Sequence, residues 1–207
     1  MPPQFIYFDL GNVLCPFDRQ VEIRQVAEVS GVPADKVREV LLGENGILWQ
    51  AERGELDDRG LYAEFCRLTA SRVEMAAFLR ANADIFTLNG ELVPLVAQLE
   101  DAQMRLGILS NTCSSHWGIL SDGRYAILLS PFRVRVLSYE VGATKPDEKI
   151  FQRAIELAGV PAKNILYIDD LPGHVEAAKK LGIDAVQYTT TDSLLRELIV
   201  RGVRCNI

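Results

Sequence analysis

The sequence predicts an α/β protein with a doubly wound parallel sheet and an inserted, all-helical second domain. Short apolar runs of strand length alternate with amphipathic stretches of helix length, and polar turn residues follow each run. Continuous apolar runs are typical of strands buried on both faces, and their alternation with helices is typical of parallel βαβ units. One stretch, residues 17–83, has helical patterns but no convincing strand. We therefore expect a core domain of residues 1–16 and 84–207, and a helical cap domain of residues 17–83.

Five runs are the candidate strands of the core domain. They are Phe5–Leu10, Leu106–Leu109, Val134–Leu137, Ile165–Ile168 and the weaker Ala185–Tyr188. The helices between them have recognisable ends, because Asp147 is a good N-cap and Gly159 suits the position after a helix C-terminus. Pro172 suits the first turn of another helix, which should stop at Gly182. We expect further core helices over Glu91–Ala102 and Ser193–Val200.

Helical patterns also fill the stretch assigned to the cap. Four helices are expected there, two of them running from a polar start to a glycine stop. They lie within residues 18–31, 33–46, 56–70 and 71–83. After Gly46, where the second of these helices should stop, we expect Glu52 and Arg53 to stabilise the cap as an arginine–carboxylate pair. Trp49 either joins that packing or faces the substrate.

Composition narrows the function classes. The chain has 207 residues, of which 48% are hydrophobic and 24% charged, as in an ordinary globular protein. Its formal net charge of −6 argues against a nucleic-acid binder, which normally has a basic face. No apolar run approaches the roughly 18 residues that span a bilayer, and the N-terminus lacks the basic segment of a signal peptide. We expect a cytoplasmic protein, monomeric or homodimeric, with reduced cysteines and neither nucleic-acid nor membrane partners.

Polar residues follow four of the predicted strands, and parallel strands place their carboxyl ends at one edge, where ligands bind. These residues are Asp9, Ser110, Asn111, Lys145, Asp169 and Asp170. A nucleophile, a hydroxyl, an amide, a cation and an acidic pair together suit phosphoryl transfer to a carboxylate. Since an aspartate has a reference pKa of about 3.9, we expect Asp9 to be ionised and ready to attack at pH 7.

The remaining members of this set would bind the metal and the phosphate. Asp9 and the acidic pair can hold Mg²⁺, which prefers a few carboxylates and offsets repulsion between the nucleophile and a phosphate dianion. The hydroxyl of Ser110, the backbone N–H of Asn111 and the Lys145 ammonium can hold the transferring oxygens. Leu10 and Gly11 follow the nucleophile, and a glycine lets this turn approach the ligand so that backbone N–H groups face the phosphate.

Four motifs in this order resemble the haloacid dehalogenase superfamily over nearly the whole chain. They are "FDLGNVL", "LGILSNT", the lysine of "GATKPDEKIF", and "LYIDDLPGHVEAAKKLG". The resemblance implies a Rossmann-like core with a helical cap, Asp9 as nucleophile, and Ser110 and Lys145 in the phosphate site. It also implies Mg²⁺ on Asp9, the Gly11 carbonyl and Asp170, while Asp169 orients the site or binds a metal-bound water.

The stretch "AERGELD", residues 51–57, resembles a particular branch of the superfamily. That branch contains bacterial α-D-glucose-1-phosphate phosphatases and the phosphatase domain of soluble epoxide hydrolases. Most phosphatases of the superfamily have a second aspartate two residues after the nucleophile, which protonates the leaving alcohol. Gly11 stands at that position here, and general acid–base help is worth roughly 10²–10⁴-fold.

Three functions are compatible with this glycine. A Mg²⁺-dependent phosphatase can act on a small phosphorylated metabolite with a good leaving group, such as a sugar 1-phosphate, through an aspartyl-phosphate intermediate. A dehalogenase needs no leaving-group acid, but such enzymes use no metal and usually lack an acidic pair like Asp169–Asp170. A non-catalytic binder of phosphorylated metabolites or of a protein partner would not need Asp9, Lys145 and Asp170 together. The phosphatase is therefore the leading interpretation.

Four further residues near the predicted site are interpreted as structural. Cys15 and Cys113 have no neighbour in the sequence that would lower a thiol pKa, so we expect buried or inert thiols. His116 and His174 belong to no motif with a defined role, and we expect surface or structural histidines.

Overall fold

The centre of the fold is a five-stranded parallel sheet with the strand order β3-β2-β1-β4-β5. The computed structural model describes residues 2–204 of the chain. The strands are β1 (Phe5–Phe8), β2 (Arg105–Ser110), β3 (Phe132–Leu137), β4 (Ile165–Asp169) and β5 (Asp184–Gln187). Each predicted strand is therefore present, and the predicted α/β fold class is confirmed. Phe8 lies opposite Ile108 on one side and Ile168 on the other, so β1, β2 and β4 end close together.

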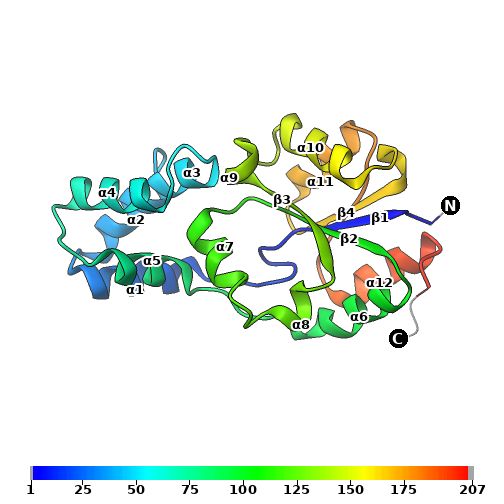
Figure 1. Ribbon diagram of the computed structural model, residues 1–207, viewed down its shortest axis with the longest axis horizontal. Helices are drawn as coiled ribbons and strands as arrows, with labels where there is room; N and C mark the ends of the chain where they lie inside the picture. Colours follow the sequence, from blue (N-terminus) through cyan, green and yellow to red (C-terminus); the bar gives the residue numbers. More distant parts are fainter. Residues whose placement is uncertain (1, 205–207) are drawn as a thin grey trace.

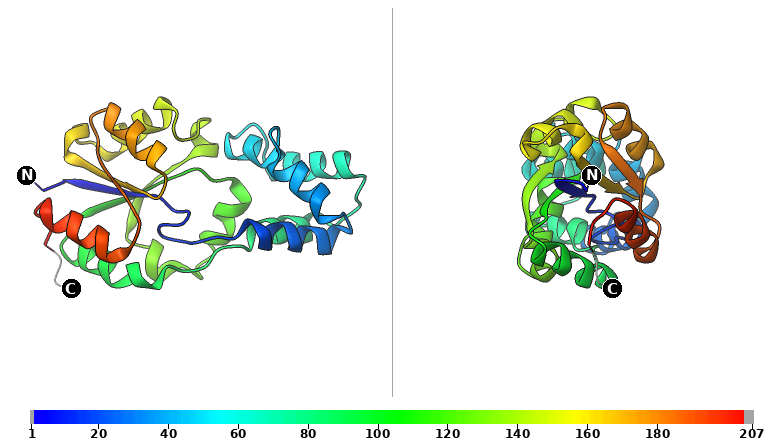
Figure 2. Two further views of the ribbon diagram at one scale, coloured as in Figure 1. Left: turned by 180° about the vertical axis from the view of Figure 1, so that it is seen from behind. Right: turned by 90° about the vertical axis from the view of Figure 1, so that its right-hand side faces the viewer.

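Helices cover both faces of the sheet (Figure 1). One face carries η1 (Gly90–Leu92), α6 (Val93–Asp101), α8 (Ala126–Leu129) and α12 (Thr191–Val200). The other carries α9 (Ser138–Val141), α10 (Glu148–Ala158) and α11 (Pro172–Lys180), with η2 (Ala162–Asn164) leading into β4. The end-on view in Figure 2 shows the same layering. Alternate β1 residues point to opposite faces, so Ile6 joins one core and Tyr7 the other.

The predicted ends of α10 are confirmed by its capping geometry. The side chain of Asp147 accepts a hydrogen bond from the backbone N–H of Lys149, which satisfies a free donor of the first turn. Gly159 has φ 63°, a left-handed conformation that glycine adopts without a Cβ penalty. These local signals are readable in the sequence because they involve neighbours along the chain.

Five helices form a separate layer beyond the carboxyl ends of the strands (Figures 1 and 2). They are α1 (Arg19–Ser30), α2 (Ala34–Leu42), α3 (Ile47–Glu52), α4 (Asp58–Thr69) and α5 (Met75–Ala83). Their apolar side chains form a third core, in which the rings of Phe65 and Phe78 stack with centroids 4.6 Å apart. The helix α3 has only six residues, too few for a periodic pattern, and the sequence did not predict it. We keep the name cap for residues 17–83.

Two segments connect the cap to the sheet and run beside each other. Phe17 and Phe86 form an antiparallel bridge, and their rings lie 5.8 Å apart. The short helix α7 (Ser114–Leu120) follows β2 and contacts α5, and Cys113 at its N-cap is part of the cap's apolar core. The loop after β2 therefore reaches from the sheet to the cap. Among the described residues, no helix is long and apolar enough to cross a membrane.

Candidate active site

Three charged side chains from different parts of the chain meet at the carboxyl ends of the central strands. The Lys145 Nζ atom lies 2.8 Å from Asp9 Oδ1 and 2.8 Å from Asp169 Oδ2. It also donates a hydrogen bond of 3.1 Å to the backbone carbonyl of Leu109. The Lys145 side chain is 1% exposed and those of Asp9 and Asp169 are 10% and 0% exposed. One buried cation thus joins two buried carboxylates.

The ends of neighbouring strands set this geometry. Asp9 directly follows β1, and its backbone N–H donates to the carbonyl of Ile168 at the end of β4. Lys145 arrives on the loop between α9 and α10. The side chain of Asn111 holds that loop, since its amide donates to the Lys145 carbonyl at 3.0 Å and its oxygen accepts from the Lys145 N–H at 2.7 Å. Asn111 thereby positions Lys145 through both backbone groups.

Burial and neighbouring charges shift the pKa values of Asp9 and Asp169 in opposite directions. Burial raises the pKa of Asp9 to about 7, although the Lys145 ammonium opposes the shift. Burial acts on Asp169 in the same direction, but Lys145 and His174 outweigh it and hold the pKa of Asp169 well below its usual range. Burial alone would lower the Lys145 pKa, yet the two carboxylates raise it. In the metal-free site, burial therefore opposes the ionisation expected of Asp9, whereas the contact with Lys145 favours it.

Asp169 is the most heavily hydrogen-bonded carboxylate of the site. Besides Lys145, it accepts from the Tyr167 hydroxyl and from the Leu171 backbone N–H, the latter at 2.8 Å. The His174 Nδ1 lies 3.1 Å from both of its oxygens. The sequence indicated only a surface or structural role for His174, and the structure places it beside the site, in contact with Asp169. Its place in the first helical turn after Asp169–Asp170 was the available signal.

The oxygen donors of this edge suit a hard divalent cation. Ligand atoms of Asp9, Asp169 and His174 lie within 4.8 Å of one another. Asp170 stands outside this cluster and is half-buried, and its Oδ2 accepts a 3.3 Å hydrogen bond from Asn12 Nδ2. Burial and the neighbouring Asp169 charge raise the Asp170 pKa, as expected where a cation is needed to balance adjacent carboxylates. The donor set is dominated by carboxylate oxygens, which fits Mg²⁺ better than a soft metal.

Phe17 takes the space beside Gly11. A Cβ atom built on Gly11 would lie 2.9 Å from Cε1 of the Phe17 ring, closer than real side chains approach. The ring of Phe17 also has the Arg19 guanidinium above it, 4.9 Å from its centroid. A longer side chain at position 11 would therefore project into the space that the aromatic ring of Phe17 occupies.

A cavity of about 30 Å³ lies beside the nucleophile turn, between the cap and the core. Its lining combines nucleophile-turn residues and the β2 loop with cap and hinge residues: Leu10, Gly11, Phe17, Arg19, Glu52, Phe86, Ser110, Asn111, Thr112 and His116. Ser110 Oγ donates to the Asn111 carbonyl at 3.3 Å. The structure thus brings Leu10, Gly11, Ser110 and Asn111 to one cavity, next to Asp9.

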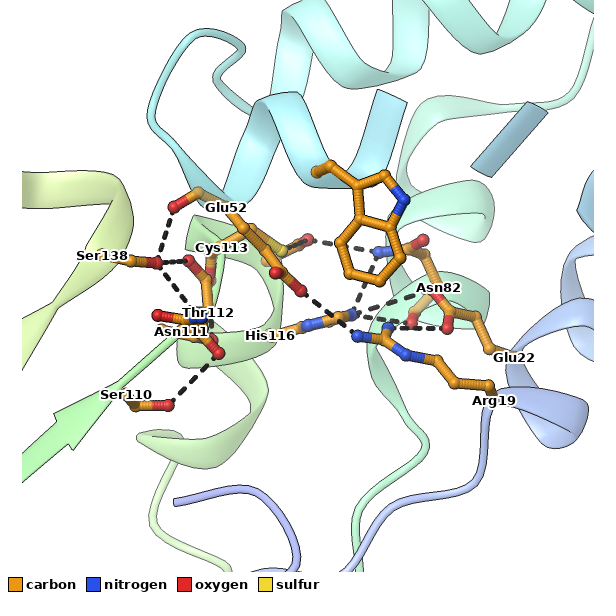
Figure 3. A network of polar contacts seen from close by, with 12 residues as sticks. Arg19, Glu22, Glu52, Asn82, Ser110, Asn111, Thr112, Cys113, His116 and Ser138 are labelled. Carbon is orange, nitrogen blue, oxygen red and sulfur yellow. Dashed lines mark hydrogen bonds and ion pairs between the residues drawn. The ribbon is translucent and has the colours of Figure 1, made fainter. Parts of the chain in front are cut away.

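The cap side of this cavity holds a network of charged residues, shown in Figure 3. Arg19 donates to Glu22 Oε2 at 2.8 Å and to Glu52 Oε1 at 3.2 Å. The expected pairing of Glu52 with Arg53 is wrong, because Arg53 points to the exposed Glu55 instead. Arg19 and Glu52 are 33 positions apart, and nothing in the local sequence indicates their pairing.

Cys15, Cys113 and His116 are buried, in surroundings that are typical of structural residues. Burial raises the pKa values of the Cys15 and Cys113 thiols to about 12, which keeps both protonated at neutral pH. His116 is buried, and its Nε2 lies 3.2 Å from the Asn82 carbonyl and 3.4 Å from the Asn82 amide. Burial, with the nearby Arg19 charge, lowers the His116 pKa to about 3, so this ring is neutral.

Residues 5–182 match the model of the haloacid dehalogenase-like hydrolase family. The chain belongs to this family. Among curated proteins it is 24% identical over 216 residues to Phosphatase MT3486 of Mycobacterium tuberculosis, covering 95% of this chain and 94% of that protein. It is also 22% identical over 203 residues to Acyl-CoA dehydrogenase family member 10 of Mus musculus, which covers 93% of this chain but only 18% of that longer protein.

Solved structures of haloacid dehalogenase-like proteins share the fold. A HAD family enzyme from Bacteroides thetaiotaomicron, crystallised in complex with magnesium and inorganic phosphate, superposes with a TM-score of 0.80 at 23% identity. The match covers 91% of this chain and 96% of that one. At this identity the similarity establishes the shared fold.

Proposed function

We propose that this hydrolase is a Mg²⁺-dependent phosphatase that cleaves a small phosphorylated metabolite through an aspartyl-phosphate intermediate. The observation that carries the proposal is the buried contact of Lys145 with both Asp9 and Asp169, each at 2.8 Å. A carboxylate nucleophile can attack a phosphate dianion only if cations offset the repulsion between them. Lys145 supplies one such charge from within the chain.

Each residue has a distinct part in this proposal. Asp9 attacks phosphorus, and Lys145 and Ser110 hold the transferring oxygens together with the backbone N–H groups of Leu10, Gly11 and Asn111. Asp169 keeps Lys145 and His174 in place. The contacts of Lys145 with Asp9 and Asp169, and the position of these residues where neighbouring strands end, support these roles.

Mg²⁺ would be held by Asp9, the Gly11 carbonyl and Asp170, while Asp169 would orient the site or bind a metal-bound water. When bound, the cation supplies the positive charge that the Lys145 ammonium alone does not provide for two carboxylates and a phosphate. The magnesium and phosphate in the B. thetaiotaomicron enzyme and the name of the mycobacterial relative support this proposal. We further propose that the enzyme acts in the cytoplasm on a small-molecule substrate, as a monomer or homodimer.

The proposed substrate class follows from the absence of a general acid at position 11. Gly11 cannot protonate a leaving alcohol, and Phe17 fills the space beside it. A sugar 1-phosphate would suit such a site, because an anomeric hydroxyl is a better leaving group than an ordinary alcohol. The "AERGELD" stretch, which resembles the glucose-1-phosphate phosphatase branch, favours the same class.

A screen of phosphorylated metabolites with and without Mg²⁺ tests the proposal. We expect hydrolysis that requires the metal, stops with a chelator, and is abolished by Asp9→Asn, which keeps the shape but removes the nucleophile. Phosphate that stays on the natural protein in strong acid after rapid quenching, but is released in base, would contradict Asp9 as the nucleophile. An acyl phosphate on Asp9 would be labile in strong acid as well as in base. Full turnover in the chelated protein would contradict the metal assignment.

A further inference from the structure

The cap side of the active-site cavity has an unusual charge balance. Arg19 is the cap cation that lines the cavity, and Glu52 lines it as well. Figure 3 shows the guanidinium directed at Glu52 and Glu22. The side chains of Glu22 and Glu52 are 0% and 8% exposed, whereas that of Arg19 is 24% exposed. The arginine is thus held between two buried carboxyls.

No net positive charge remains in this cluster for an anionic ligand. Burial raises the pKa values of Glu22 and Glu52, and Arg19 opposes both shifts. With both carboxyls ionised the cluster carries −1, and with one proton on the pair it is neutral. His116 Nε2 lies 3.9 Å from Glu22 Oε1, but burial and Arg19 lower the His116 pKa to about 3, so its ring adds no charge near neutral pH. Within residues 2–204, Glu22 Oε1 has no hydrogen-bond partner.

Glu52 lines the same cavity as Gly11 and Ser110, but on its cap side. Asp9, Lys145 and Ser110 lie on the core side, where the transferring group is bound. The leaving group must extend toward the cap, past Phe17 and Arg19. A second anionic group at that position would meet Glu52 without a free cation, whereas hydroxyl or amide N–H groups can donate to the carboxylate.

We propose, on the basis of the phosphatase function above, that Glu52, positioned by Arg19, is a specificity-determining residue. It selects phosphate esters whose leaving group is uncharged and bears hydrogen-bond donors, and it rejects leaving groups that carry a carboxylate or a second phosphate. The same charge balance disfavours 2-haloacids, which are carboxylates at neutral pH.

Two esters of nearly equal size test this selection. They are 4-carbamoylphenyl phosphate and 4-carboxyphenyl phosphate, which differ in the charge at the far end of an aryl leaving group and slightly in its acidity, a difference that is the same for the natural protein and for Glu52→Gln. We expect the natural protein to hydrolyse the amide ester with a kcat/KM at least about tenfold higher. Glu52→Gln should reduce this preference to within about threefold, chiefly by lowering KM for the carboxylate ester.

Glu55→Gln is the matched control, because Glu55 lies in the same stretch but pairs with Arg53 at the surface. It should keep the natural preference. Thermal unfolding of each variant checks folding, and the natural protein alone already provides a decision if Glu52→Gln does not fold. Equal rates on the two esters by the natural protein, or an unchanged preference in folded Glu52→Gln, would overturn this inference alone. Absence of hydrolysis of either ester by the natural protein, with no activity in the metabolite screen, would overturn the phosphatase function and this inference with it.

Discussion

At the scale of single residues, the site depends on how burial changes ordinary side chains. Asp9 is an unremarkable aspartate in the sequence, but burial raises its pKa to about 7 despite an ion pair with Lys145. Asp169, beside the same lysine, is shifted in the opposite direction. A buried carboxyl that is partly protonated without metal and ionised with metal links folding stability, pH and cofactor binding.

The raised pKa of Asp9 predicts a pH-dependent stability. The unfolded chain has an Asp9 pKa near 3.8 and the metal-free folded chain one of about 7. Between these values the folded state binds more protons, so the charge on Asp9 destabilises the fold progressively as pH rises, and fully above about pH 7. Asp9→Asn removes this effect. In chelator, we expect its thermal midpoint to exceed that of the natural protein by more at pH 8 than at pH 5.

The exposed Asp101 provides a control for that comparison. Asp101→Asn should shift the midpoint similarly at both pH values. An Asp9→Asn advantage that is equal at pH 5 and pH 8 would contradict the raised pKa.

Gly11 predicts a steep dependence of rate on leaving-group acidity. Since this residue cannot donate a proton, aryl phosphates and sugar 1-phosphates should react much faster than sugar 6-phosphates or glycerol phosphate. We expect kcat/KM of Gly11→Asp for the poorest leaving groups to exceed that of Gly11→Ala, which has the same Cβ, by about 10²-fold, the lower end of general acid help. The measurement is kcat/KM over a series of esters graded by leaving-group pKa.

The contact with Phe17 makes Gly11→Ala the necessary control. It adds the Cβ that would meet the ring at 2.9 Å, but no acid. Its rates should fall uniformly across the series and leave the slope steep. A flat series for the natural protein would mean that another residue donates the proton.

At the scale of elements, the loop after β2 connects the sheet to the cap through Ser138 at the start of α9. The buried Ser138 Oγ accepts from the Thr112 N–H at 2.9 Å and donates to the Glu52 carbonyl at 2.6 Å. One hydroxyl therefore joins the loop of Ser110–Thr112 to the end of α3, where Glu52 lies. The helices α3 and α9 are too short to give a periodic pattern in the sequence, so their placement beside the sheet depends on this junction.

Ser138→Ala should weaken the junction. It leaves the buried N–H of Thr112 without its partner, which costs about 1–3 kcal/mol of unfolding free energy. Because Glu52 is then held less firmly, the preference between the carbamoyl and carboxy esters should also fall. Denaturant unfolding and the two-ester assay measure these effects. Ser130→Ala, at an exposed serine, should change neither, and an unchanged stability of Ser138→Ala would show that the junction contributes nothing.

At the scale of the whole molecule, the cap lies over the carboxyl ends of the strands and the site lies between them. The cavity of about 30 Å³ has room for roughly one water molecule. Larger substrates therefore have to enter with cap and core further apart than in this structure. The paired segments at Phe17 and Phe86 are the two chain connections about which such a movement would occur.

Metal binding should stabilise the whole chain. A ligand that binds only the folded state at about 100 times its Kd adds about 2.7 kcal/mol, or about 5–10 °C in a chain of this size. We expect such a shift of the thermal midpoint with Mg²⁺ and its loss in Asp170→Asn. That variant should keep the metal-free midpoint, because Asp170 is half-buried and has one side-chain partner.

Asp169→Asn distinguishes a ligand from a positioning residue. Asp169 accepts hydrogen bonds from Lys145, Tyr167 and Leu171, so its substitution should lower the metal-free midpoint itself. If Mg²⁺ raises the thermal midpoint of Asp170→Asn as much as that of the natural protein, the metal is held by the cluster of Asp9, Asp169 and His174 instead.

The α/β fold class, the positions of the strands and main helices along the chain, and the grouping of Asp9, Lys145 and Asp169 beyond the strands could be predicted from the sequence. These depend on periodicity, capping and turns, which involve residues close along the chain. The pairing of Arg19 with Glu52 and the burial that raises the Asp9 pKa could not be predicted, because they arise when segments far apart in the chain pack together. His174 and Phe17 lie only a few positions from Asp169 and Gly11, but the three-dimensional path of each turn is what brings these pairs into contact.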